Sequence, residues 1–203
     1  MSTTSVSAAI VRHIEEIEVA LRHIRNVMDP RLEKEAGRLI ERKRKAFGWA
    51  GAVDDHLDPV CWLAPEQWRM ANDTNDYFDL YINFESSNCI DEAEPETWVA
   101  RFLGFAGSGM RFTFGSNGLF RPKWKAFLRS EPLVQQLVDQ GFVCDPKAGL
   151  LALPIRIYKD ALLSAFEDQD FSEAMAPIEA QLDRIKALRP ALDRLVEAIR
   201  ARA

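Results

Sequence analysis

The chain has 203 residues, of which 47% are hydrophobic and 28% are charged, and its formal net charge is −5. This is an ordinary composition for a globular domain, and the length suffices for a core that needs no disulfide or metal. The sequence lacks a run of about 18 apolar residues, and its start lacks a basic segment followed by a long apolar core. It therefore predicts neither a membrane span nor a secretory signal.

The three cysteines, Cys61, Cys89 and Cys144, lie far apart in the sequence. An odd number of scattered cysteines is typical of free thiols in a reducing compartment. We therefore expect a cytoplasmic protein without a disulfide framework and without membrane association.

The charges are segregated along the chain. The net charge is +3 over residues 1–50, −11 over 51–100, +5 over 101–157 and −2 over 158–203. Such blocks can neutralise one another after folding, or they can leave an acidic face that binds a basic partner or a cation.

The first predicted element is a helix over residues 5–28, in which apolar side chains recur in steps of four and three. This stripe consists of Ile10, Ile14, Ile17, Leu21, Ile24 and Met28. Heptad spacing marks one seam of a helix that packs along another helix, within the chain or in a second chain. Asp29 and Pro30 are expected to end this helix and start the next. The residue before a proline avoids the helical region, and proline favours the first helical position.

A second helix is predicted over residues 31–47, with Gly48 as its stop, and it carries a run of four bases. The run is Arg42, Lys43, Arg44 and Lys45. Four consecutive bases wrap around a helix instead of forming one stripe, so they suit a solvated C-terminal helix end. Phosphate binding is the alternative. Residues 48–76 show no clear pattern beyond a short helix after Pro65.

The β signal begins with strict alternation of apolar and polar residues over 77–85, which predicts a strand with one buried face. An apolar segment over 98–105 predicts a second, more central strand. A tight turn at 107–109 then leads to a third strand over 110–114.

The polar face of this predicted sheet offers candidate catalytic residues. Asp79 and Glu85 share one face of the first strand, and Arg111 projects from the third. Two carboxylates could hold a divalent cation, and the guanidinium could position a phosphoester. However, the acid-x-Lys pattern of metal-dependent nucleases is missing, and a solvated face with cross-strand ion pairs is the favoured interpretation. We predict no metal ligand set and no cofactor.

Residues 123–129 and 131–140 are predicted to form one broken helix or two short helices, followed by a hairpin with strands at 142–144 and 150–157. Basic residues around an aromatic ring can bind phosphates and stack a base. The first of these helices therefore adds three candidate nucleic-acid-binding residues to the basic run: Lys123, Trp124 and Lys125.

The C-terminal region, residues 172–202, is predicted to be helical with a kink or break at Pro190, which lacks an amide donor and clashes with the preceding turn. Arg189 occupies one slot of its apolar stripe and argues against an uninterrupted coiled coil. The other members of the stripe are Ile178, Leu182, Ile185, Leu192, Val196 and Ile199.

Together these elements predict an α+β fold. A mainly antiparallel sheet of about four to five strands spans residues 77–157. Long N- and C-terminal helices flank it and either pair or form a helical appendage. Residues 1–203 are expected to form a single domain, with 5–47 and 172–202 as a candidate helical subdomain.

The leading functional interpretation is a non-enzymatic interaction or assembly module that binds a protein partner or a second copy of itself. The alternatives are a metal-dependent phosphoesterase or nuclease-like enzyme at Asp79 and Glu85, and nucleic-acid binding through the basic helix. An uncovered apolar stripe would favour assembly, whereas a cleft with converging carboxylates would favour catalysis. The predicted partner-binding residues are Ile10, Ile14, Ile17, Leu21, Ile24, Leu192, Val196 and Ile199.

Overall fold

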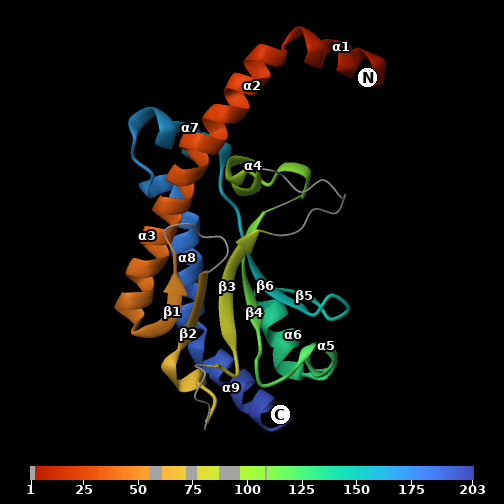
Figure 1. Cartoon of the computed structure of the whole chain (residues 1–203). Coiled ribbons are helices and arrows are strands. Elements are labelled where there is room, and N and C mark those ends of the chain that lie inside the picture. Colours follow the sequence, from red (N-terminus) through yellow and green to blue (C-terminus); the bar gives the residue numbers. More distant parts are fainter. Residues whose placement is uncertain (1–2, 55–60, 72–76, 87–96, 108) are drawn as a thin grey trace.

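The computed structural model describes residues 3–54, 61–71, 77–86, 97–107 and 109–203. It confirms the predicted α+β class: one open sheet is flanked by helices (Figure 1). The described residues form a sheet of six strands in the order β1-β2-β3-β4-β6-β5, and every neighbouring pair is antiparallel.

The sheet is larger than expected because two of its strands come from the segment 48–76, which shows no clear sequence pattern. The predicted hairpin is confirmed as β5 and β6, and the predicted third strand as β4. The first predicted strand corresponds to β3, which begins at Tyr81 rather than Tyr77. The strands are β1 (Trp49–Val53), β2 (Cys61–Pro65), β3 (Tyr81–Ser86), β4 (Met110–Gly115), β5 (Val143–Asp145) and β6 (Leu150–Ile155).

The helices surround this sheet. The predicted helices at 123–129 and 131–140 are confirmed as α5 and α6, and the C-terminal region is helical with a break at Leu188, just before Pro190. The helices are α1 (Thr3–Arg12), α2 (Ile14–His23), α3 (Asp29–Phe47), α4 (Trp98–Phe102), α5 (Arg121–Ser130), α6 (Pro132–Asp139), α7 (Lys159–Asp168), α8 (Ser172–Ala187) and α9 (Arg189–Arg200), with a π-helical turn at Ile24–Met28 and 3₁₀ turns at Glu66–Trp68 and Phe105–Gly107.

The predicted break at Asp29 does not occur. Asp29 has helical torsion angles (φ −59°, ψ −51°), and α2 continues through the π turn into α3. A π turn is wider than an α turn, so it can accommodate the missing donor and the ring of Pro30 within a continuous helix. Gly48 ends α3 as predicted, in the left-handed conformation (φ 66°) that a residue without Cβ adopts at little cost.

The predicted strand at 98–105 is wrong, because this segment begins with helix α4 and continues into a 3₁₀ turn. Two side chains hold the first turn of α4. The carboxylate of Asp29 accepts from Val99 N at 3.0 Å, and Thr97 Oγ1 accepts from Ala100 N at 3.3 Å. Asp29 is therefore a helix cap, but for α4 and not for its own helix.

The core lies between one face of the sheet and the helices α3, α8 and α9. Figure 1 shows α3 and α8 side by side; α3 contacts β1 and α8 contacts β6. Each large apolar side chain buried there contributes about 1.5–3 kcal/mol relative to an exposed one. The central strands supply Ile82, Phe84, Phe112 and Phe114, and the helices supply Leu32, Ile40, Ile178, Leu182 and Ile185.

Candidate functional site

The N-terminal helix projects from the rest of the molecule, and we call residues 3–28 the arm (Figure 1). None of its side chains described from residue 5 onward is buried. Of the predicted stripe, Ile10 is 46% exposed and Ile14 is 45% exposed, while the four later members are half-buried. The predicted stripe therefore exists, and no part of the described chain buries it.

The arm is not one straight helix. His13 (φ −115°, ψ 22°) separates α1 from α2, so the stripe is continuous on one helix only from Ile14 to Met28. Val19 lies on the opposite side of α2 and is 63% exposed. A run of uncovered apolar residues along a projecting helix is typical of an interaction surface.

The C-terminal stripe lies in the core instead. Leu192 and Ile199 are 0% exposed and Val196 is 1% exposed. These three residues are therefore not a partner surface, contrary to the prediction. The terminal helices do pair, but the contact is between α3 and α8, and the arm takes no part in it.

The two candidate catalytic carboxylates do not converge. Asp79 lies two residues before β3, and its Oδ2 accepts from Arg200 Nε at 2.7 Å. Glu85 lies on β3 and pairs across the sheet with Arg111 Nη2 at 2.9 Å. Among the described residues no three metal-ligating side chains gather. The hypothesis of a cation held by both carboxylates is therefore wrong, and Glu85 with Arg111 forms the cross-strand ion pair that was the alternative.

The polar sheet face nevertheless contains a hollow of about 270 Å³, which we call the sheet-face pocket. Register places Asn83 beside Thr113 on neighbouring strands, with Tyr81 further along the same face. The start of α5 forms one side of the pocket, through Arg121 and Trp124. The pocket residues used below are Tyr81, Asn83, Glu85, Thr113, Arg121 and Trp124.

Trp124 is a structural residue in this arrangement. It is 6% exposed, stacks on Phe127 with ring centroids 5.7 Å apart, and donates from Nε1 to Gly149 O at 3.0 Å. Its ring cannot stack on a base without leaving this position, contrary to the sequence-based hypothesis. Of its predicted companions, Lys123 lies over the ring of Phe120, 5.2 Å from the centroid, and Lys125 is half-buried.

The basic run at the end of α3 is paired with carboxylates. Lys43 Nζ lies 2.8 Å from Asp183 and 2.9 Å from Glu179 of α8, and these hydrogen bonds raise the pKa of Lys43. The other three bases also face carboxylates, and Arg44 donates to Glu41 at 2.7 Å. This bond lowers the pKa of Glu41 to about 2. Arg42 lies 3.7 Å from Glu179 and Lys45 lies 3.2 Å from Glu41.

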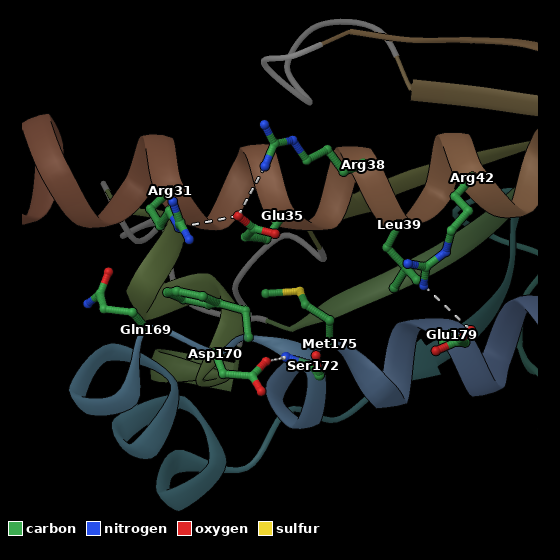
Figure 2. Close-up of a pocket in the computed structure, with 11 residues that line it drawn as sticks. Arg31, Glu35, Arg38, Leu39, Arg42, Gln169, Asp170, Ser172, Met175 and Glu179 are labelled. Carbon is green, nitrogen blue, oxygen red and sulfur yellow. Dashed lines mark hydrogen bonds and ion pairs between the residues drawn. The ribbon is translucent and has the colours of Figure 1, made fainter.

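A second hollow, of about 340 Å³, lies between α3 and the start of α8, and we call it the arginine groove (Figure 2). Figure 2 shows Arg31 and Arg38 directed toward Glu35, and Arg42 directed toward Glu179. Glu35 Oε1 lies 3.3 Å from Arg31 Nε and 3.5 Å from Arg38 Nη1. The sequence analysis did not predict this groove, although Arg31, Arg38 and Arg42, at positions i, i+7 and i+11, share one face of α3. Facing carboxylates balance the charge of the groove, so it is not a strongly anion-attracting surface.

Comparison with protein-family models, with curated proteins and with solved structures finds no match to this chain. Among the described helices, none is both long enough and apolar enough to cross a bilayer. The arm, the sheet-face pocket and the arginine groove are therefore the surfaces from which a function can be inferred.

Proposed function

We propose that this protein is an assembly module whose arm pairs with the arm of a second copy. The observation that carries the proposal is the apolar stripe from Ile14 to Met28, which no described part of the chain buries. The residues of α9 that have the same heptad spacing are, by contrast, buried against other parts of the chain. A second helix of similar pattern would cover the stripe in the same way.

The charges of the arm favour a second copy in antiparallel orientation. The first half of α2 is acidic, with Glu15, Glu16 and Glu18, and the following segment is basic, with Arg22 and Arg25. A parallel pair would place like charges side by side. An antiparallel pair brings opposite charges together, because the acidic first half of one α2 then lies beside the basic end of the other. The resulting interface has two-fold symmetry and closes on itself.

The expected affinity is modest. Its own helix already covers part of each stripe side chain, so burying the remainder is worth about 1 kcal/mol per side chain. Association costs about 4–15 kcal/mol in lost freedom of motion. A short paired arm therefore predicts a weak dimer, with a Kd no tighter than roughly tens of micromolar, which dissociates on dilution.

The test is Ile17→Asp combined with Leu21→Asp, followed by sedimentation across a range of concentrations. Wild-type protein is expected to dimerise, and the double variant to be a folded monomer, because neither side chain belongs to the buried core. Val19→Asp is the control, since it places one aspartate on the opposite side of α2 and should leave the dimer intact. A wild-type monomer at all concentrations would contradict the proposal, and so would unfolding of the double variant.

The other two functions have weaker support. The carboxylates needed for metal-dependent chemistry are separated and paired, and the basic run on α3 is paired with acids. We also propose that the protein is cytoplasmic. Two described cysteines, Cys61 and Cys144, are free thiols, as is typical of reducing compartments.

A further inference from the structure

We propose that the sheet-face pocket binds the oxyanion group, phosphate or carboxylate, of a small ligand. No residue of the arm lines this pocket, so the inference is independent of self-assembly. It rests on three observations: hydrogen-bond donors without partners, a positive end of the pocket, and a size suited to a small molecule.

Thr113 is the most informative residue of the pocket. It is 7% exposed and lines the pocket, and its side chain makes no hydrogen bond with any described residue. Thr113 Oγ1 is not among the fully buried side-chain atoms that lack a partner, so it opens onto the pocket. A ligand there would accept a hydrogen bond from it, because a hydroxyl can donate to an oxyanion.

Two further donors lie beside this hydroxyl. Asn83 is the cross-strand neighbour of Thr113, and Tyr81 lies two residues before Asn83 on the same face of β3. Neither side chain hydrogen-bonds to a described residue. The ring of Tyr81 covers Gly115, where a Cβ would come within 2.5 Å of the tyrosine Oη. Burial raises the pKa of Tyr81, so its hydroxyl remains a protonated donor.

The end of the pocket at α5 is positive. Arg121, the first residue of α5, lines the pocket and forms no ion pair with a described residue. No side chain caps this helix start, so its positive end is not neutralised. At the other end, Arg111 neutralises Glu85. A guanidinium next to neutral donors is the arrangement that binds phosphate or carboxylate oxygens.

The dimensions favour a small ligand over a polymer. A volume of about 270 Å³ is at the lower limit of typical ligand sites. Because the ring of Trp124 is already stacked on Phe127, Trp124 offers no free aromatic platform for a base of a nucleic acid.

The test is an NMR titration of the full-length, isotope-labelled protein with inorganic phosphate or with acetate, each compared with sodium chloride at equal ionic strength. Saturable shifts are expected at the amides of Thr113 and Arg121 and at the indole N–H of Trp124. The tighter of the two probes identifies whether the ligand group is phosphate or carboxylate. Absence of saturable shifts with both probes, or equal shifts with chloride, would overturn the proposal.

Three variants distinguish binding of the anion in the pocket from nonspecific attraction by surface charge. Thr113→Val removes the hydroxyl and keeps the side-chain shape, and Arg121→Gln removes the charge. Each is expected to weaken binding about tenfold, as expected for loss of a hydrogen bond to a charged group. Arg129→Gln removes the same charge at the other end of α5 and should have no effect. If it weakens binding equally, the pocket is not the site. If Thr113→Val fails to fold, Arg121→Gln decides, because that side chain is exposed.

Discussion

Arg200 connects the last helix to the segment that precedes β3. Its Nε donates to Asp79 Oδ2 at 2.7 Å, and its Nη2 donates to the carbonyl of Gln67 at 2.8 Å. Nearby, Trp68 Nε1 donates to Asp193 Oδ1 at 2.7 Å. Two carboxylate hydrogen bonds therefore attach α9 to the remainder of the core.

Asp79→Asn is expected to lower the free energy of unfolding by about 2 kcal/mol, because it removes the buried one of the two carboxylates that pair with Arg200. Denaturation with urea measures the change. Glu197→Gln is the matched control, since Glu197 pairs with the same Arg200 at 2.9 Å but is 71% exposed, and exposed pairs contribute about 0–1 kcal/mol. Equal effects of the two substitutions would show that the burial of Asp79 does not matter.

The partners of Asp79 and Glu85 illustrate what residue patterns can predict. Alternation along β3 correctly predicts that Asn83 and Glu85 share a polar face, because successive side chains of a strand point to opposite sides. The pairing of Asp79 with Arg200 connects residues 121 positions apart, and local spacing holds no information about such a contact. The candidate metal site was wrong for this reason.

At the scale of elements, long periodic segments were predicted well and short ones were not. The heptads and the alternating strands extend over enough residues for their period to be recognised. The five residues of α4 are too few to distinguish an apolar helix turn from a buried strand. The deciding groups are Thr97, and Asp29, which is distant in the sequence. β1 and β2 were missed because their short sequences mix strand formers such as Trp49 and Val53 with Gly, Ala and Pro.

Asp29→Ala is expected to destabilise α4, since loss of a capping side chain costs about 1 kcal/mol. Hydrogen exchange should show faster exchange at the Val99 amide, which donates to Asp29 Oδ1 at 3.0 Å. Asn is a comparable capping residue, so Asp29→Asn should leave this exchange rate nearly unchanged. Unchanged exchange in both variants would mean that Asp29 does not hold the start of α4.

At the scale of the whole molecule, the two terminal apolar stripes have the same heptad spacing but differ in burial. Ile199 of α9 is 0% exposed, and Ile14 of the arm is 45% exposed. Periodicity shows only that a helix has an apolar side, and the rest of the fold determines whether that side is covered. Sequence spacing therefore predicts an apolar stripe on each terminal helix, but the fold alone shows that the stripe of α9 is buried and that Ile10 and Ile14 of the arm are exposed.

No described side chain of the arm is buried, so we predict that the arm and the rest of the chain, which we call the body, behave independently. Deletion of residues 1–23 removes no buried side chain among those described and keeps Asp29, the cap of α4. The free energy of unfolding of the monomeric body should therefore change by less than about 0.5 kcal/mol. The shortened protein should sediment as a monomer and still bind the oxyanion probe with wild-type affinity. Loss of probe binding together with the dimer would mean that the pocket is complete only in the assembled protein. A large loss of stability would mean that the arm packs on its own chain in solution.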